Sequence, residues 1–330
     1  MEEELKNLKP RTRIVAFISL LVAIGYSAYH VYRRFHFSFW IGLILLWLII
    51  FKTQFVFSIW GLMFSYWIIL DSILPIPEAY ILSLLFIYIF YGMYNMNHFR
   101  VKKYDIIAPF DLDIIQLSDL HIGSGMNFHA FEKAFVSMQS KNPDVIVITG
   151  DLVDESTYEQ EFIKMMPLLT NLQARLGKYY IYGNHDCTTS WQQEKLDCYM
   201  KQCGFTLLCD SSIVFDDFTL IGRNDAFKTR KSMDLYPTSS YTIVLDHQPV
   251  DLYMEAENQV DLTLCGHTHN GQIWPMGWMD RLLKENDLVY GHKIFGTMHA
   301  IVTSGLGGWG YPIRTQGHSE YVWVQLKKEQ

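Results

Sequence analysis

Five short motifs between residues 119 and 269 contain side chains that commonly bind metal ions. They supply carboxylates, imidazoles and one amide, and none of these candidate ligands is a thiolate. Oxygen and imidazole ligands suit Mn²⁺, Fe or Zn²⁺ better than Cu(I) or an iron–sulfur cluster. The candidate ligands are Asp119, His121, Asp151, Asn184, His247, His267 and His269.

The number of these candidates decides the kind of metal site that the sequence predicts. A single tetrahedral zinc ion needs about four ligands, whereas two ions about 3.5–4 Å apart that share a carboxylate can use the whole set. Such a pair lowers the pKa of a water molecule between the ions and neutralises charge on phosphoryl oxygens. The sequence therefore predicts two divalent metal ions, with Mn²⁺ preferred and Fe or Zn²⁺ as alternatives, and hydrolysis of a phosphate ester.

The order of the motifs carries more weight than any one of them. A DxH or HxH triplet often occurs by chance, and a single buried histidine is usually a hydrogen-bonded core residue. Here each motif follows an apolar run, and glycines at positions 150, 183 and 266 stand where a sharp turn from strand to loop is expected. His247 has the shortest motif. His292 and His299 lack a motif partner and lie in an expected long loop after the last motif.

The residues around the motifs alternate between strand and helix patterns. β-branched runs predict buried strands, and apolar residues at a helical spacing predict helices. Expected strands are 113–117, 145–148, 178–182, 241–245, 260–264, 300–303 and 321–326, with a hairpin formed by 212–215 and 218–221. Expected helices are 128–140, 162–176 and a segment that begins at a capping box of Ser190 and Gln193 and ends before Gly204.

This mixture of elements favours an α/β or α+β sandwich over a doubly wound parallel sheet. In open α/β sheets, ligands bind beyond the carboxyl ends of the strands. Asp119, Asp151, Asn184, His247 and His267 each come just after such an end. We therefore expect separate strands to bring these side chains to one edge.

The first hundred residues differ in composition from the remainder. Four apolar runs, at 14–32, 35–51, 55–70 and 80–94, are rich in aromatic residues. A membrane span needs about 20 apolar residues, and about 17 can suffice. We therefore predict a bundle of about four transmembrane helices in residues 1–100 and a catalytic domain in residues 101–330. The acidic leader and the lack of a small-residue cleavage site argue against a secretory signal peptide.

Lysines and arginines indicate how such helices would be oriented. With four spans, one side holds the basic residues at the chain start, at Lys52 and at residues 100–103. The positive-inside rule then places both chain ends in the cytoplasm, although Arg33 and Arg34 would face outward. The predicted location is the cell inner membrane, as a multi-pass protein whose catalytic domain is cytoplasmic.

Charge and cysteine content argue against two classes of protein. The net charge of -7 disfavours a general nucleic-acid binder, so no stable nucleic-acid partner is expected. The five cysteines are odd in number and form no CxxC pair, which favours reduced thiols over a disulfide framework. The sequence does not indicate an oligomeric state.

The complete set of motifs resembles the calcineurin-like metallophosphoesterase superfamily, from residue 113 to about residue 326. The Gly-Asp-Leu-Val-Asp form, the run from Gly266 to Ile273 and the tail around Arg314 resemble a bacterial membrane-associated subgroup. That subgroup includes predicted phosphodiesterases and UDP-2,3-diacylglucosamine pyrophosphatase-like enzymes. The resemblance implies a four-layer sandwich of two mixed β-sheets flanked by helices. Asn270 replaces a glycine that is common after the last motif, but it is not an implied ligand.

The resemblance also divides the candidate ligands into two sets that share one bridging carboxylate. The first set is Asp119, His121, Asp151 and His269, and the second set is Asp151, Asn184, His247 and His267. His185 would be the catalytic residue, as general acid or transition-state stabiliser. Asp186 would either orient His185 or shape a turn, and Asp154 would shape a turn. Arg314 would either contact a substrate phosphate or form an exposed ion pair.

Together these features predict a membrane-anchored dinuclear-metal phosphoesterase. A catalytic edge held near a bilayer meets membrane substrates at a high effective concentration, which favours a phosphodiester or pyrophosphate in a lipid-linked substrate. The expected partner is the membrane lipid bilayer, and the segments 274–278 and 307–311 would either meet lipid or pack as ordinary loops. The alternatives are a cyclic-nucleotide or nucleic-acid phosphodiesterase resident on the membrane, and a non-catalytic metal-binding membrane sensor.

Overall fold

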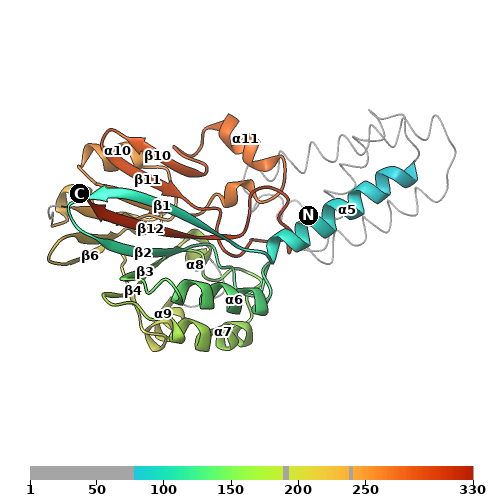
Figure 1. Cartoon of the computed structure of the whole chain (residues 1–330), viewed down its shortest axis with the longest axis horizontal. Helices are drawn as coiled ribbons and strands as arrows, with labels where there is room; N and C mark the ends of the chain where they lie inside the picture. Colours follow the sequence, from blue (N-terminus) through green and yellow to red (C-terminus); the bar gives the residue numbers. More distant parts are fainter. Residues whose placement is uncertain (1–77, 189–192, 238–240, 330) are drawn as a thin grey trace. The chain divides into compact units, whose positions relative to one another are not determined.

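Two six-stranded mixed sheets form the framework of the described residues from Phe90 onward (Figure 1). The computed structural model describes residues 78–188, 193–237 and 241–329. The first sheet has the strand order β1-β12-β2-β3-β4-β5. Its strands are β1 (Arg100–Ala108), β2 (Leu112–Leu117), β3 (Val145–Thr149), β4 (Gly177–Ile181), β5 (Phe205–Leu207) and β12 (Glu320–Lys328).

The second sheet has the strand order β10-β11-β9-β8-β7-β6. Its strands are β6 (Ser211–Val214), β7 (Thr219–Gly222), β8 (Thr242–Leu245), β9 (Leu262–Cys265), β10 (Gly291–Phe295) and β11 (Met298–Val302). In both sheets a parallel centre is extended by antiparallel pairs, which are β12 with β2, β6 with β7 and β10 with β11. The parallel strands at the centre of each sheet end at a common edge. The candidate ligands follow these strand ends in the sequence.

Apolar residues on both faces of the first sheet explain why it is covered on each side. Successive side chains of a strand point to opposite faces. In β2, Ile115 and Leu117 pack with three helices, whereas Ile114 packs between the sheets with Leu245 and Leu264 of the second sheet. The three helices are α6 (Phe128–Gln139), α7 (Glu159–Asn171) and α9 (Gln193–Gln202), which lie together beside this sheet in Figure 1.

The outer face of the second sheet is covered by shorter elements. Ile221, Val244 and Ala300 from three of its strands pack with Leu252 of α10 (Leu252–Glu257) and Met233 of the 3₁₀ helix η1 (Met233–Leu235). The predicted sandwich of two mixed sheets flanked by helices is therefore confirmed for the described part of the chain.

Several expected elements have different bounds, and some were missed. The helix expected at 162–176 is α7, which ends at Asn171 because Leu172 is already extended. β1 and β5 were not expected, and His292 and His299 lie on β10 and β11 instead of in a long loop. The hairpin of β6 and β7 is confirmed. Ser190 of the predicted capping box lies outside the described residues.

The N-terminal predictions fall mostly outside the described residues. The runs 14–32, 35–51 and 55–70 are not described, whereas the run 80–94 lies within helix α5 (Glu78–Met96). α5 is helical over 19 residues. Of the helices in the described part of the chain, α5 included, none has the length and apolarity needed to cross a membrane.

Candidate metal centre

The loops that follow β2, β3, β8 and β9 bring the predicted ligands from both sheets together. Backbone hydrogen bonds join these loops in pairs within each sheet, and the His267 N–H donates to Asp119 Oδ1 at 3.1 Å between the loops of the two sheets. The Asp119 N–H donates to the Gly150 carbonyl at 3.0 Å, and the Gly266 N–H donates to the His247 carbonyl at 3.1 Å. The expectation that separate strands deliver these motifs to one edge agrees with this arrangement.

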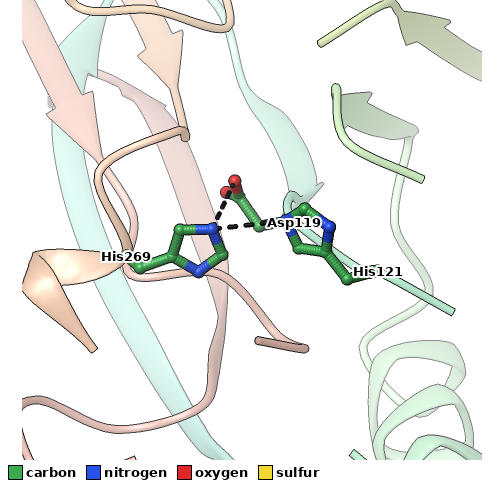
Figure 2. A group of neighbouring side chains, drawn as sticks. All are labelled: Asp119, His121 and His269. Carbon is green, nitrogen blue, oxygen red and sulfur yellow. Dashed lines mark hydrogen bonds and ion pairs between the residues drawn. The ribbon is translucent and has the colours of Figure 1, made fainter. Parts of the chain in front are cut away.

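The first cluster consists of Asp119, His121 and His269, whose side chains point toward one another (Figure 2). His269 Nε2 lies 3.4 Å from Asp119 Oδ1 and 3.3 Å from His121 Nε2. All three residues are buried. Two imidazole nitrogens and a carboxylate oxygen therefore face a single point inside the protein.

The second cluster consists of Asp151, His247 and His267. His247 Nε2 lies 3.1 Å from Asp151 Oδ2, and the same carboxylate oxygen lies 3.7 Å from His121 Nε2 of the first cluster. Within each cluster, the atoms that could bind a metal ion lie within 4.8 Å of one another. Asp151 therefore stands between the clusters, where one carboxylate can serve two ions.

The hydrogen bonds of His247 test whether these residues fit a cation. Its Nδ1 lies 2.7 Å from the Thr149 carbonyl and so is assigned as the protonated nitrogen. In the neutral ring, Nε2 then points a lone pair at the carboxylate of Asp151, and this buried nitrogen forms no hydrogen bond. Buried charges in proteins are paired or coordinate metals, so a cation placed here would satisfy both groups. The donor set therefore fits a divalent metal ion.

The acid–base properties of the two carboxylates also favour a cation. Burial raises the pKa of Asp119, and the neighbouring charge of Asp151 adds to this effect. Burial would also raise the pKa of Asp151, but His247 and His121 outweigh it and hold that pKa well below its usual range. Burial opposes the charged form of His247, yet Asp151 and Asp119 raise its pKa to about 10. A metal ion must displace the proton of His247, so metal binding is expected to weaken as the pH falls.

Unusual backbone conformations accompany five of the six clustered residues. The φ angles are 51° at Asp119, 40° at His121, 54° at Asp151, 71° at His267 and 51° at His269. Residues other than glycine rarely adopt positive φ, and such strain persists where the surrounding structure enforces it, often at functional sites. These five residues therefore have strained backbone conformations, which direct their side chains into the clusters.

All three glycines in the motifs are required by close packing. A Cβ atom at Gly183 would overlap Asp151 Oδ1, and one at Gly266 would overlap Ser118 Oγ and Asp119 Oδ2. A Cβ atom at Gly150 would overlap His247 Nδ1, and this glycine also has a φ of 88°. The prediction that these positions need glycine, for close approach or for positive φ, agrees with all three.

His185 borders the first cluster and is partly exposed. Its ring centroid lies 5.2 Å from that of His121 and 5.1 Å from that of Trp309. Its Nδ1 lies 3.2 Å from Glu155 Oε1. Burial disfavours the charged ring, but Glu155 and Asp151 outweigh this effect and raise the pKa of His185. The side chain can therefore carry a proton beside the clusters and still be reached by a substrate.

Asp186 does not orient His185, so of the two alternatives the structure supports the turn-forming one. Its carboxylate accepts backbone N–H groups from Gly183, Asp151, Leu152 and Val153, at distances between 2.8 and 3.0 Å. Glu155 is the carboxylate that contacts His185, and the motif analysis missed it because no fixed spacing connects the two positions.

Asp154 shapes a turn as expected, whereas the position of Arg314 differs from the sequence expectations. Asp154 shapes its turn through Ser156, but its Oδ2 also lies 3.2 Å from His121 Nδ1, which fixes that ring. Arg314 is completely buried and neither forms an exposed ion pair nor faces solvent. Its guanidinium donates to the carbonyls of His269 at 3.0 Å and Gly307 at 2.6 Å, so it braces the loop of the last motif.

Asn184, the remaining predicted ligand, is the first residue of α8 (Asn184–Thr188). Its side chain is buried, and its Oδ1 lies 3.4 Å from Gln248 Nε2. Gln248 directly follows His247 of the second cluster, so Asn184 is placed near that cluster. Its role as a ligand stays a prediction.

Comparison with known proteins agrees with this geometry. Residues 112–271 match the calcineurin-like phosphoesterase family. The chain is 32% identical over 231 residues to an uncharacterized metallophosphoesterase of Helicobacter pylori strain J99, in an alignment that covers 66% of this chain and 60% of that protein. It is 29% identical over 266 residues to an uncharacterized metallophosphoesterase of Aquifex aeolicus, covering 74% of this chain and 98% of that protein.

One relative carries a name that refers to a membrane. The chain is 27% identical over 267 residues to a Danio rerio protein called transmembrane protein with metallophosphoesterase domain. The alignment covers 72% of this chain and 60% of the Danio rerio protein. This chain therefore spans less than two thirds of the Helicobacter pylori and Danio rerio relatives.

Proposed function

Because this chain contains a calcineurin-like metallophosphoesterase domain, we propose that it is a metal-dependent hydrolase of phosphoric ester or pyrophosphate bonds. The observation that carries the proposal is the position of Asp151, whose carboxylate lies 3.1 Å from His247 and 3.7 Å from His121. A carboxylate shared by two metal ions is typical of centres that hydrolyse phosphate esters.

The residues of both clusters would hold two divalent ions, with Asp151 between them and Asn184 completing the second set. When bound, such ions activate a water molecule and neutralise charge on the phosphoryl group. His185 would donate a proton to the leaving oxygen, and Glu155 would hold its ring in position. The Thr149 carbonyl and Asp154 would fix the rings of His247 and His121. We propose Mn²⁺ as the native metal, with Fe or Zn²⁺ as alternatives.

We further propose that the protein is anchored to the cell inner membrane and that its substrate is lipid-linked. Support comes from the apolar runs between residues 14 and 70 and from the name of the Danio rerio relative. Residues 1–100 would form the anchor and residues 101–330 the catalytic domain, on the cytoplasmic side. Anchoring would concentrate the enzyme near membrane substrates. A cyclic-nucleotide or nucleic-acid phosphodiesterase is the alternative, and a panel of soluble and lipid substrates separates the two.

The proposed activity can be tested with the purified full chain in detergent. After removal of metals with a chelator, added Mn²⁺ should restore hydrolysis of bis-p-nitrophenyl phosphate. The variant Asp151→Asn should lose both bound metal and turnover, whereas Asp216→Asn, at an exposed hairpin turn, should keep both. A wild-type protein that binds the metals but turns over no phosphate ester or pyrophosphate would instead support the non-catalytic sensor.

A further inference from the structure

Helix α11 (Met276–Leu283) exposes large apolar side chains directly after the last histidine motif. Trp278 is 62% exposed and Leu282 is 66% exposed, and Trp274, just before the helix, is 57% exposed. Single exposed apolar residues are ordinary, but a group that includes two tryptophans on one short segment marks an interaction surface. The positions 278 and 282 are one helical turn apart, so these side chains share a face.

The exposed face is fixed to the metal centre. Arg281 of α11 donates to Asn270 Oδ1 at 2.7 Å, and Asn270 directly follows His269. The Gly277 N–H donates to Gln316 Oε1 at 3.2 Å, and a Cβ atom at Gly277 would overlap Asn270. The apolar face therefore lies on a helix that is braced against the loop carrying a predicted ligand.

A second group of exposed aromatic residues lies on the last turns of α5. Phe90 is 66% exposed and Tyr94 is 61% exposed. The Arg314 N–H donates to the Gly92 carbonyl at 2.9 Å, and Asn95 Nδ2 donates to the Arg314 carbonyl at 2.9 Å. Thr315, next along the chain, accepts the N–H of Trp274 at 3.1 Å. Both exposed groups therefore border the same segment around Arg314.

The charges beside these groups favour one kind of partner. Arg100, Lys102 and Lys103 are exposed on β1, a few residues after α5. Tryptophan and tyrosine are enriched where a protein meets the headgroup region of a bilayer, and neighbouring basic residues attract anionic lipids. The apolar runs at 14–70 precede this region in the chain. These features suit a lipid surface better than a second copy of the chain.

We propose that α11 and the last turns of α5 form an interfacial surface that lies on a lipid bilayer, with Trp278 and Leu282 inserted among the headgroups. The proposal rests on the proposed membrane attachment and deepens it, because it gives the catalytic domain a contact with lipid of its own. A short amphipathic helix held in this way would keep the adjacent metal centre at the level of the phosphates of membrane lipids.

Photo-crosslinking of the full chain in nanodiscs tests the contact. The discs contain phosphatidylethanolamine and phosphatidylglycerol, and benzoylphenylalanine replaces Trp278 in one protein and Tyr253 in the control. Tyr253 has a similar exposure, 60%, but lies on α10. Mass spectrometry should find a phospholipid adduct at position 278 and none at position 253. Adducts from position 278 to residues 1–77 or to a second copy, or none to lipid, would overturn the proposal.

Activity measurements on the same discs separate this proposal from the proposed function. The double variant Trp278→Ser/Leu282→Ser should keep turnover of soluble bis-p-nitrophenyl phosphate but lose roughly tenfold on a p-nitrophenyl phosphodiester carried by a lipid in the disc. The control Tyr253→Ser/Leu235→Ser should lose neither. Equal rates on the lipid ester for both double variants would contradict the interfacial surface. Absence of turnover in wild-type protein would refute the hydrolase, while the crosslinking result would still stand.

Discussion

At the scale of single residues, three of the imidazoles in the proposed chemistry each lie against a second group. The Thr149 carbonyl holds His247, the Asp154 carboxylate holds His121, and the Glu155 carboxylate holds His185. Such partners fix the orientation of a ring and decide which nitrogen carries the proton. The first two rings can then present their other nitrogen to a metal ion, and the third can present its proton to a substrate.

His185 should contribute to turnover and not to metal binding. The variant His185→Ala is expected to retain both ions but to lower kcat by about 10²–10⁴-fold, which is typical of a lost general acid or base. Metal content by mass spectrometry and steady-state kinetics on bis-p-nitrophenyl phosphate measure the two effects separately. Loss of metal in this variant would show that His185 is instead part of the metal site.

Glu155 should control the pH dependence of the reaction. A general acid must be protonated, so the rate falls as the pH rises through the pKa of His185, and Glu155 raises that pKa. The variant Glu155→Gln should therefore move the alkaline limb of the kcat profile to lower pH. The variant Glu132→Gln, which changes an exposed carboxylate beside His129, serves as the control. An unchanged alkaline limb in Glu155→Gln would remove Glu155 from the mechanism.

Residue types and their order were enough to find the six clustered side chains, because a metal site needs specific donors at strand ends. The partners of those donors could not be found in this way. Asp186 is next to His185 in sequence, yet four backbone N–H groups hold its carboxylate in a turn. Glu155 reaches His185 only because that turn directs the following loop, and this course depends on tertiary hydrogen bonds.

At the scale of elements, the turns after the strands determine the geometry of the site as much as the candidate ligands do. Gly183 follows β4 in contact with Asp151, so its lack of a side chain leaves room for the Asp151 carboxylate. Arg314 links the loop of His269 to Gly307 through hydrogen bonds to the backbone carbonyls of both residues. The strands fix the approximate position of each motif, and these packing contacts fix its final geometry.

The variant Gly183→Ala should therefore lose metal and activity while remaining folded enough to purify. Its Cβ must displace Asp151 Oδ1 or the neighbouring backbone, which disturbs the bridging position. The control is Gly296→Ala in the β10–β11 turn, where a Cβ has open space and only the φ of 61° is unfavourable. The control should lose about 1 kcal/mol of stability or somewhat more. Metal content and the thermal midpoint distinguish the two variants.

Continuous apolar runs made most strands predictable, because both faces of each central strand are buried. Ile114 and Ile115 illustrate this, since they enter two different cores. β1 gave no such signal. Its first four residues are exposed, and three of them, Arg100, Lys102 and Lys103, are basic. Its pairing with β12 joins segments more than 200 residues apart. Such an edge strand forms because it pairs with its neighbour, so its own residue pattern does not predict it.

At the scale of the whole chain, the boundary between the proposed anchor and the proposed catalytic domain depends on how the last turn of α5 packs. Met96 is completely buried, and the Ser319 hydroxyl donates to its carbonyl at 2.8 Å. Asn95 donates to the carbonyls of Arg314 and Gly317. The predicted boundary at residue 100 would remove these contacts, whereas a boundary near Phe90, where the compact unit begins, would retain them.

Two truncated chains test this difference. A chain of residues 90–330 should fold and hydrolyse bis-p-nitrophenyl phosphate, because it keeps every contact of Asn95 and Met96. A chain of residues 101–330 should be less stable by several kcal/mol, since loss of a buried methionine alone costs about 2–5 kcal/mol. Thermal or urea unfolding compares the two, and Met96→Ala within 90–330 isolates the methionine. Equal stability of both truncated chains would show that α5 belongs wholly to the anchor and adds nothing to the catalytic domain.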